Sequence, residues 1–599
     1  MPDSTPSSTP STTDPSAPTV PAVPSAPGAV SAPAAPSAPA APRRLGTWAR
    51  RRPRRGLLAA LVAAGAVVGL LPGAPATATT GLTPHDPVAE YLAGWDVRRV
   101  ADGVTVYSGT VGDPTSGSWT VTVLGAAGGD GAGTALRLRG RAEAERLAER
   151  VRQAGAAPRV ERVDWPGAAV GEGEEGAYGW RVRVGSAAGQ AEAAALAAPL
   201  RAAGLTTAVE WTGADAEPGS GGADLWVTVI DPDAFTGEIT ADPGAAVAGR
   251  ETVAAIAARR DALLAVNAGY FVMEERDGIP GAAAGIAVYD GRVQQAATDG
   301  RVALVLDGDG LRPRLAELST ELTVTAPRVG PREGHGAAGH GATGDGATRE
   351  VDGVNRRPGL VRNCGGVGGD APTESPRHDV TCTDADEIVA YTPELGADTP
   401  AGEGVEVLLD ARSRVTGFRA PGGPVPAGGR VLRGIGEGAD WLNRYARVGD
   451  PLRIRERVVD ERGRPLALDA ADDVVGGGPR LVENGRAAID FAADGLVHPD
   501  NSDFAYTWGI KRHSRQLVGV DAAGRVLLVT ADGRRPGVSD GLGLAEAAEL
   551  LVDLGAEQAM NLDGGGSVTL AVDGEVVNAP SDAAGPRAVG DALLVLPGR

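Results

Sequence analysis

The chain is poor in lysine, cysteine and aromatic residues. Lys511 is the only lysine among 599 residues, there are two cysteines, and aromatic residues make up 4% of the sequence. Alanine, glycine, arginine and proline are abundant instead, so we attribute the shortage of lysine to a bias in base composition and give it no function. Two cysteines without nearby histidines make a poor zinc site, and we predict no metal centre.

Positive charge is also in short supply. The formal net charge is -20 at pH 7. Non-specific binding to nucleic acid depends on a positively charged surface that replaces the counterions of the phosphate backbone. The composition therefore excludes nucleic acid as an expected partner.

An uncharged apolar run lies near the N-terminus. It covers residues 56–71, follows seven arginines between residues 43 and 55, and precedes small-residue sites at residues 74–78. This order is typical of a signal peptide, and the run is shorter than the ~20 residues that a spanning helix needs. We predict a cleaved signal at residues 43–78, with an uncleaved membrane anchor as the alternative, and an extracytoplasmic location.

Two further expectations follow from composition and export. Residues 1–42 consist almost only of Ala, Pro, Ser, Thr, Val and Gly, cannot bury apolar surface and should be disordered. In an exported protein Cys364 and Cys382 are expected to pair, which would stabilise the fold by roughly 3 kcal/mol in the chain-entropy model. The alternative is two unrelated thiols.

The middle of the chain contains an internal near-repeat. Length alone predicts about four domains. After a leading segment at residues 79–115, which could hold the first strand of the catalytic domain, residues 116–212 show the pattern strand, helix, strand twice over. Such a pair of units forms one four-stranded antiparallel sheet with two helices on one face, a ferredoxin-like fold. A Gly/Asp/Pro linker follows at residues 213–222.

This repeat resembles a SPOR domain, a module that binds peptidoglycan glycan strands. Strands are expected at residues 119–123, 158–163, 180–185 and 207–211, and helices at residues 142–154 and 190–203. The resemblance implies that the helix-free face of the sheet binds the glycan, without fixing the contact residues. A ferredoxin-like fold with no ligand is the alternative.

The last 377 residues, 223–599, centre on the motif NLDGGGS at residues 561–567. Apolar residues recur at helical spacing over residues 544–551, and strands are expected on both sides of the motif. Glycines let backbone N–H groups face one point, and such a concave run binds anions. Asp563 adds a carboxylate and Ser567 a hydroxyl, which suits chemistry on a phosphorylated substrate. The alternative is a glycine-rich loop with a capping Asp.

Six blocks in order make this region resemble the phosphodiester glycosidase family. They are residues 267–271, 476–479, 515–519, 530–534, 561–567 and 578–582. The resemblance implies an α+β chain in which the SPOR-like module accompanies a larger mixed α/β glycosidase domain. If the first family strand lies at residues 97–106, the module is inserted into that domain. One departure is Gln516, where the family usually has threonine.

The resemblance and the residue chemistry together imply roles for individual residues. The leaving phosphate monoester is a weak base and needs charge stabilisation, which Arg515 and Arg534 can supply. A carboxylate stabilises or attacks the oxocarbenium-like carbon, with Asp563 as first choice and Asp532 as second. Residues expected to bind sugar or phosphate, or to support those that do, are Asn267, Asn561, Gly564, Gly565, Gly566, Ser567 and Asp582.

The sequence thus predicts an exported hydrolase of glycosyl phosphodiesters that is held at the cell wall by the SPOR-like module. Its substrate would be a sugar-phosphate polymer or a small glycosyl phosphodiester, with no cofactor; a need for a divalent ion stays open. A catalytically silent wall-binding protein is the first alternative, favoured by Gln516. A metal-dependent phosphodiesterase is the second, and the six histidines, mostly in expected loops, argue against it.

Overall fold

The computed structural model describes residues 86–126, 136–171, 173–298, 301–327, 347–364, 381–497, 501 and 503–598. The predictions of disorder at residues 1–42 and of a signal or anchor at residues 43–78 lie outside these residues. Within them, every helix is too short or too polar to cross a membrane.

An eight-stranded antiparallel sheet, here called the central sheet, forms the scaffold of the region that carries the family motifs. Its middle strands are buried along their whole length, as expected for continuous Val- and Leu-rich runs. In spatial order the strands are β1 (Asp96–Ala101), β2 (Val104–Asp113), β7 (Gly221–Ile230), β28 (Val526–Ala531), β27 (Arg515–Asp521), β29 (Ala556–Asn561), β25 (Arg480–Glu483) and β26 (Arg486–Ala487).

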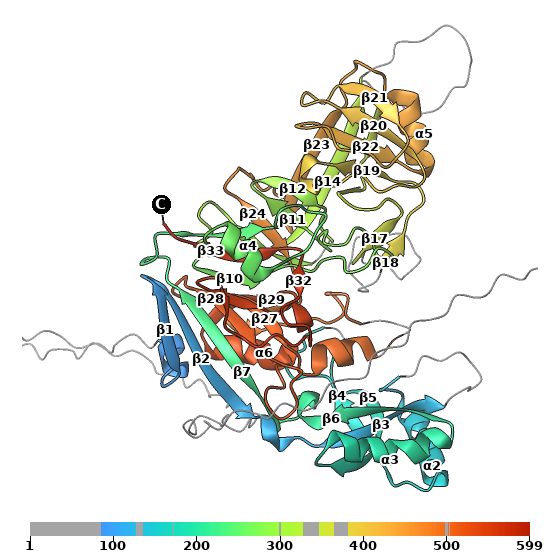
Figure 1. The fold of residues 1–599 in the computed structure, drawn as a ribbon, viewed down its shortest axis with the longest axis vertical. Coiled ribbons are helices and arrows are strands. Elements are labelled where there is room, and N and C mark those ends of the chain that lie inside the picture. Colours follow the sequence, from blue (N-terminus) through green and yellow to red (C-terminus); the bar gives the residue numbers. More distant parts are fainter. Residues whose placement is uncertain are drawn as a thin grey trace, which may run out of the picture. The chain divides into compact units, whose positions relative to one another are not determined.

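Different layers cover the two faces of the central sheet. Helix α6 (Leu544–Asp553) packs on one face through the side chains that the helical spacing selected, with Gly555 in a left-handed conformation just past its end (Figure 1). A five-stranded antiparallel sheet packs on the other face. Its strands are β31 (Glu575–Val576), β30 (Leu570–Val572), β10 (Leu264–Asn267), β33 (Ala592–Leu596) and β8 (Glu238–Asp242).

Two further sheets are built mainly from residues between β10 and β25. One contains β12 (Arg292–Gln295), β11 (Ala287–Tyr289), β24 (Asp473–Gly476), β13 (Val302–Leu306), β14 (Arg314–Ala326), β15 (Ala347–Glu350) and β23 (Arg453–Asp460). The other contains β16 (Gly353–Val354), β19 (Ile388–Tyr391), β22 (Arg430–Gly434), β20 (Val405–Leu409) and β21 (Val415–Arg419), with α5 (Gly436–Tyr445) packed on it.

The remaining elements are short. They are α1 (Pro87–Tyr91), α4 (Val253–Arg259), a π-helix at Ala505–Ile510, and the pairs β17 (Leu360–Arg362) with β18 (Thr381–Thr383) and β32 (Ala588–Val589) with β9 (Glu251–Thr252). A disulfide joins Cys364 to Cys382 beside the first pair, as the sequence predicted. The larger domain is therefore sheet-rich with few helices, because most strands pair antiparallel rather than through helical crossovers.

The repeat at residues 116–212 forms its own four-stranded antiparallel sheet with two helices on one side (Figure 1). The order is β4 (Pro158–Asp164), β5 (Ala177–Ala187), β3 (Trp119–Ala126) and β6 (Leu205–Trp211), covered by α2 (Arg141–Gln153) and α3 (Gln190–Ala202). We call this unit the inserted module, because β2 and β7, which flank it in sequence, pair with each other from Val104 opposite Ile230 to Asp113 opposite Gly221.

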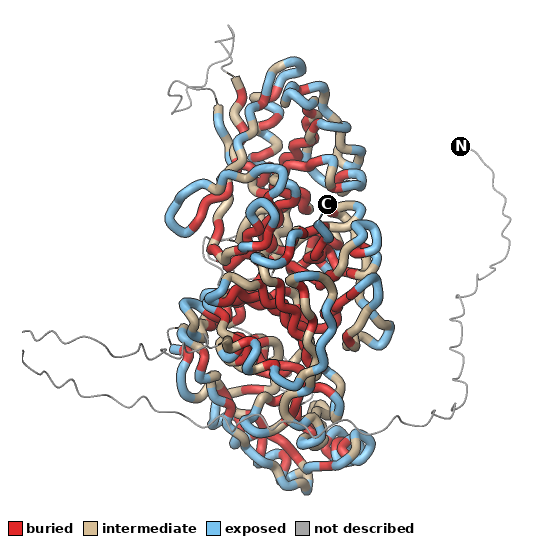
Figure 2. The backbone as a smooth tube through the Cα atoms, turned by 90° about the vertical axis from the view of Figure 1, so that its left-hand side faces the viewer, coloured by how far each residue is buried: buried red, intermediate tan, exposed pale blue. Residues whose placement is uncertain are grey.

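Both faces of the module's sheet are buried. Val121, Val182 and Leu200 form an apolar core on the helix side. On the helix-free side Arg181 and Arg183 are 4% and 1% exposed. Residues of the larger domain thus cover part of the helix-free face, while Arg159 and Glu161 at its edge keep side-chain exposures of 44% and 26%, and binding of glycan to this face stays a prediction. Figure 2 shows buried residues concentrated inside the molecule and exposed ones along its loops.

Candidate functional site

Strand ends from two packed sheets bring the family motifs together. Arg515 begins β27, and Asn561 ends the antiparallel neighbour β29, so both lie at the same end of the central sheet. Asn267 ends β10 in the sheet packed against it. Its side-chain amide donates to the Asp563 carbonyl at 2.7 Å and accepts from the Thr569 N–H at 3.1 Å. The two hydrogen bonds of the Asn267 side chain thus join segments that lie about three hundred residues apart in the sequence.

Asp563 carries the half-buried carboxylate of this cluster. Its Oδ1 accepts from the Gly564 N–H at 2.9 Å. Burial raises the pKa of Asp563 to about 6, against the lowering effects of the Ser567 hydroxyl, the Gly564 N–H and the guanidinium groups of Arg587 and Arg534. A carboxyl group with such a pKa can change protonation state near neutral pH, which is a property of catalytic acids and bases.

The glycine run does not form the predicted anion nest. The Gly564 N–H donates to Asp563, and the Gly565 N–H donates to the Ser514 carbonyl at 2.9 Å. Two of the three N–H groups are therefore already used inside the loop. The loop instead forms a 3₁₀ turn at Gly565–Ser567, which the flexible backbone of the triple glycine permits.

The glycines instead make room for charged side chains. A Cβ on Gly565, whose φ is +64°, would lie 2.8 Å from an Arg534 guanidinium nitrogen. A Cβ on Gly566 would lie 2.1 Å from Arg587 and 2.2 Å from Asp582. The run thus lets guanidinium groups from other loops approach the Asp563 backbone closely, which a larger residue would prevent.

Arg515 is a buried cation beneath the glycine run. Its guanidinium donates to the carbonyl oxygens of Leu542, at 3.1 Å, and Trp508, and lies over the Trp508 ring at 4.9 Å. Burial and the nearby Arg534 lower the pKa of Arg515 to about 9. Among the described residues no carboxylate forms an ion pair with it, so its charge is balanced only by dipoles and an aromatic face.

Arg534 is the exposed guanidinium of the cluster, and no described carboxylate forms an ion pair with it. Its Nε donates to His513 Nδ1 at 3.0 Å. Burial, together with Arg515 and Arg534, lowers the pKa of His513 to about 3, so the imidazole stays neutral. Because Nδ1 accepts, Nε2 carries the proton and donates to the Thr507 carbonyl. The imidazole therefore orients Arg534 and does not act as a base.

Three of the predicted site residues form side-chain hydrogen bonds that hold loops in place. Asn561 is buried and donates to the Tyr270 hydroxyl and the Gly478 carbonyl, both at 3.0 Å. Asp532 is 1% exposed, and its oxygens accept from the Asn578 amide and the Ala579 N–H, each at 2.9 Å. Asn267 likewise bonds through both its side-chain oxygen and its side-chain nitrogen, whereas the Asn561 Oδ1 is buried and accepts no hydrogen bond from the described residues.

Asp582 and Arg587 form an ion pair over Gly566, with Nε–Oδ2 and Nη2–Oδ1 distances of 2.8 and 3.0 Å. Asp591 lies deeper, where it accepts from the Gly269 N–H and the Tyr289 hydroxyl, both at 2.8 Å. Burial raises the pKa of Asp591 to about 6, and Asp563 contributes to that rise. The sequence analysis included Asp582 but missed Arg587 and Asp591, which follow it within ten residues.

Sequence reasoning also missed an aromatic pair. Tyr270 and Trp508 are partly exposed, and their ring centroids lie 6.0 Å apart. Tyr270 belongs to the 267–271 block, but Trp508 lies in a stretch that matched no family block. An aromatic residue seven positions before a site arginine carries no periodic signal, so only the fold could reveal it.

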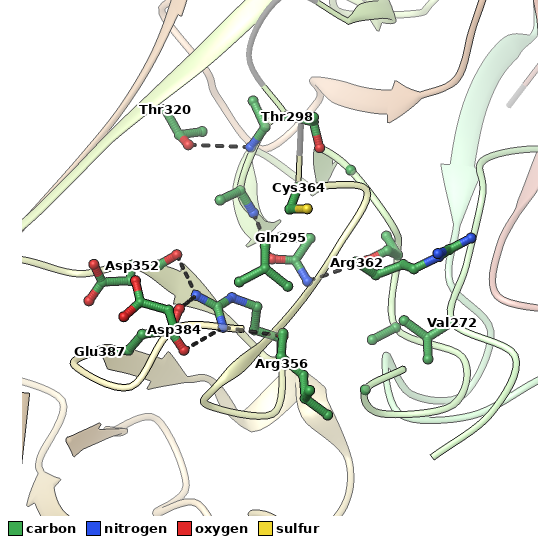
Figure 3. Close-up of a pocket in the computed structure, with 18 of the residues that line it drawn as sticks. Val272, Gln295, Thr298, Thr320, Asp352, Arg356, Arg362, Cys364, Asp384 and Glu387 are labelled. Carbon is green, nitrogen blue, oxygen red and sulfur yellow. Dashed lines mark hydrogen bonds and ion pairs between the residues drawn. The ribbon is translucent and has the colours of Figure 1, made fainter. Parts of the chain in front are cut away.

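A separate cavity of about 320 Å³ shares no lining residue with the Asp563 cluster (Figure 3). Arg356 lies in its wall with its guanidinium bonded to Glu387, and Asp352 lies beside them. Burial raises the pKa of Asp352 to about 6. Because Arg356 is neutralised by its partner, this cavity lacks the unpaired positive charge found around Asp563.

Comparison with known proteins agrees with the motif blocks. The sequence profile of the phosphodiester glycosidase family matches residues 403–596. This range contains Arg515, Arg534, Asp563 and Asp582 but not Asn267. A mouse N-acetylglucosamine-1-phosphodiester alpha-N-acetylglucosaminidase is 42% identical over 69 residues, which are 12% of this chain and 13% of the mouse protein.

Solved structures extend the relationship. A candidate exported protein from Burkholderia pseudomallei K96243 is 30% identical, with a TM-score of 0.70 over 88% of this chain and 100% of its own. The catalytic domain of the zebrafish N-acetylglucosamine-1-phosphodiester alpha-N-acetylglucosaminidase is 16% identical over 65% of this chain and 78% of that one, with a TM-score of 0.29, too low to compare sites. The family profile thus identifies a phosphodiester glycosidase domain in residues 403–596, and the bacterial relative shares the fold of most of the chain.

Proposed function

We propose that the protein is an exported hydrolase that cleaves the bond between a sugar's anomeric carbon and a phosphodiester oxygen. One observation carries this proposal: the half-buried Asp563 carboxylate lies beside Arg534 and above Arg515, two guanidinium groups without a described carboxylate in ion-pair distance. A carboxylate for the sugar carbon and unpaired positive charge for the phosphate are the two groups that the reaction needs.

The guanidinium groups act on the leaving phosphate. Breaking the carbon–oxygen bond converts a phosphodiester with one negative charge into a monoester that approaches two, with a second pKa of about 6. Arg534 is exposed and can contact the phosphate directly, whereas Arg515 adds positive potential from below. Because the charge on the phosphate grows as the bond breaks, both stabilise the transition state more than the substrate.

Asp563 and the aromatic pair act on the sugar. An ionised Asp563 stabilises positive charge at the anomeric carbon or attacks that carbon, and water completes the hydrolysis. Trp508 and Tyr270 present partly exposed rings next to the cluster. We propose that one of them stacks on the sugar ring, since aromatic faces provide a large apolar surface with fixed geometry.

We further propose that the protein acts outside the cytoplasm. The Cys364–Cys382 disulfide and the bacterial relative classed as a candidate exported protein support this location. Wall polymers with sugar-phosphate links are a natural substrate class. If the inserted module also binds peptidoglycan, the buried centre of the helix-free face, around Arg181 and Arg183, does not take part.

The test of the proposed function is hydrolysis of a chromogenic sugar-1-phosphodiester by the purified protein and by Asp563→Asn. We expect turnover by the wild type and none by the variant, with both equally folded by circular dichroism. Asp573→Asn is the matched control, because Asp573 lies in a hairpin turn and bonds only to Arg98 on the surface. Full activity in Asp563→Asn would remove this carboxylate from the mechanism.

The catalytically silent alternative rested on Gln516, and the structure weakens that argument. Consecutive residues of a strand point to opposite faces. Arg515 packs on Trp508, whereas the Gln516 side chain is buried on the other face and accepts from the Thr530 hydroxyl at 2.8 Å. The departure from the family pattern therefore lies on the face of β27 opposite Arg515, where Gln516 contacts Thr530. Binding to peptidoglycan in a pull-down without any turnover would support the silent alternative.

A metal-dependent phosphodiesterase would cleave the other phosphorus–oxygen bond. The two reactions are separated by identifying the released phosphate and by repeating the assay with a chelator. We expect a free sugar and a phosphomonoester that keeps the chromogenic group, with the rate unchanged by chelation. Release of a sugar phosphate, or loss of activity with chelator, would favour the metal-dependent reaction.

A further inference from the structure

The helix-free face of the inserted module is covered by a segment that also reaches the candidate site. We call residues 503–512 the bridging segment. On the module side, Asp503 accepts from the Arg137 and Leu138 N–H groups at 2.6 and 2.9 Å, and the Tyr506 hydroxyl accepts from Arg181 Nη1 at 2.6 Å. Tyr506 is 1% exposed. The module is therefore fixed to the larger domain by buried polar bonds.

Charge strengthens this contact. Arg183 Nη2 donates to Asp215 Oδ1 at 3.0 Å on the module side. Lys511 Nζ of the bridging segment lies 3.7 Å from Asp215 and 3.9 Å from Glu210, and stands over the Tyr506 ring at 5.7 Å. The chain's only lysine thus lies near Glu210 of the module and Asp215 just after it, and adds positive charge beside Arg183.

The opposite side of the bridging segment faces the candidate site. The Thr507 carbonyl accepts from His513, whose other nitrogen orients Arg534. The Trp508 carbonyl accepts from Arg515, and the Trp508 ring lies under the same guanidinium. Thr507 and Trp508, neighbours in the bridging segment, therefore position both guanidinium groups of the site. The module contacts the opposite side of this segment.

Bonds around Arg512 continue the connection. The Arg512 N–H donates to the Ala214 carbonyl at 2.8 Å, and its Nη1 donates to the Gly213 carbonyl at 2.6 Å. Trp211 Nε1 donates to Asp540 Oδ1 at 2.8 Å. A Cβ on Gly533, the neighbour of Arg534, would lie 3.0 Å from the Asp540 carbonyl. The end of the module and the residues that follow it therefore bond to Arg512 and to Asp540, and Asp540 packs closely against the neighbour of Arg534.

We propose that the inserted module supports the two arginines of the site, Arg515 and Arg534, and we call this support the brace. Tyr506 and Lys511 are the positioning residues through which the module holds the bridging segment in place. The catalytic part of this inference rests on the proposed function. The bridging segment includes a π-helical stretch, which is rarely stable without tertiary support. Arg515, a buried cation without a described ion-pair partner, is held by the Leu542 and Trp508 carbonyl oxygens and by the Trp508 ring, and Trp508 belongs to the bridging segment. The support comes from the module.

The test uses the full-length protein with Tyr506→Phe and Lys511→Met, which keep the side-chain size but remove the bonds to Arg181 and to the two carboxylates. Lys511→Arg is the conservative rescue. Arg162→Met is the matched control, because Arg162 belongs to the same module but lies on its surface, paired with Asp164. Two readouts are needed: hydrogen exchange of the amides of residues 512–516, and kcat and KM for the chromogenic phosphodiester.

In Tyr506→Phe and in Lys511→Met, we expect the amides of residues 512–516 to exchange hydrogen at least tenfold faster than in the wild type. We also expect kcat to fall about tenfold with little change in KM, since small misplacements of charge-stabilising groups act on the transition state. Lys511→Arg should restore both values, and Arg162→Met should change neither. If hydrogen exchange of residues 512–516 is unchanged in both positioning variants, the proposal that the module supports the site arginines is wrong. If the wild type shows no turnover, the proposed function fails, and the exchange measurement still decides whether the module supports this segment.

Discussion

Two buried arginines, Arg183 in the inserted module and Arg515 in the candidate site, are each 1% exposed but have opposite surroundings. Arg183 pairs with Asp215 and has Glu161 and Glu210 within 3.4 Å. Although burial opposes the charge, these carboxylates raise the pKa of Arg183 well above its ordinary value. Arg515 bonds only to carbonyl groups, and burial lowers its pKa to about 9.

This difference separates a structural charge from a functional one. A buried ion pair is destabilising when one partner is removed, because the other charge remains without compensation. A buried cation that lacks a partner already carries that penalty in the folded protein, and a negatively charged ligand relieves it. We therefore expect Arg183 to stabilise the folded state and Arg515 to favour the binding of an anion.

The largest expected effect comes from breaking the paired arginine. Arg183→Met leaves the buried Asp215 carboxylate without its main partner and should lower the free energy of unfolding by about 3–5 kcal/mol. Urea unfolding of the wild type and the variant measures this difference. The double variant Arg183→Met with Asp215→Leu should recover most of the loss. If the single variant were as stable as the wild type, the pairing would not be structural.

Removing the unpaired arginine should have the reverse outcome. Arg515→Met is expected to leave stability unchanged or slightly higher, and to lower kcat/KM about a hundredfold, the usual loss when one preorganised charge-stabilising group is removed. Inorganic phosphate should raise the Tm of the wild type more than chloride at equal ionic strength, and should not do so for Arg515→Met. Equal phosphate stabilisation in both proteins would contradict an anion-binding role.

The fold was predictable where periodicity was strong. The alternating and helical patterns of residues 116–212 gave the order of β3, α2, β4, β5, α3 and β6, since each element buries one face against a common core. The covered helix-free face was not predictable. Arg181 and Arg183 on a strand would be expected to face solvent, and Tyr506, which accepts a hydrogen bond from Arg181, lies more than three hundred residues away in the sequence.

The site was predictable as a set of loops but not as a set of roles. Glycine and aspartate at strand ends indicated the loop of Asp563, because such positions are held by rigid strands, and the role of Asp563 stays a prediction. The roles of Asn267, Asn561 and Asp532 depend on which hydrogen bonds are already satisfied, and a motif does not contain that information. Trp508 and Arg587 were missed because each acts through a contact between distant segments.

A smaller effect concerns the protonation of Asp563, which sharpens the contrast between paired and unpaired charges. Burial raises its pKa from 3.8 to about 6, so the native state holds the proton more tightly than the unfolded chain. The group's contribution to stability is complete below pH about 4 and is lost as the pH rises through about 6. Asp563→Asn, which is always neutral, should therefore be more stable than the wild type by about 1–2 kcal/mol at pH 7, allowing for partial solvent screening.

This difference should disappear near pH 4, where the wild-type carboxyl is protonated. Urea unfolding at pH 4, 5, 6 and 7 provides the measurement. Wild-type activity should fall as the pH drops below about 6 if the ionised carboxylate is the active form. A stability difference that stayed constant across this range would show that Asp563 titrates at its ordinary pKa and that its burial has no functional consequence.

The smallest effect is expected for an ion pair between an arginine and an aspartate at the surface. Arg98 and Asp573 form an ion pair at 2.6 Å with side-chain exposures of 46% and 57%. Arg98→Met should change the free energy of unfolding by less than about 0.5 kcal/mol and leave kcat/KM unaltered, because water and salt already screen both charges. Raising the salt concentration to 1 M should remove even this difference while leaving the effect of Arg183→Met almost intact, since buried pairs are screened far less. A large loss of stability in Arg98→Met would mean that exposure does not distinguish these pairs, and that the contrast between Arg183 and Arg515 needs another physical cause.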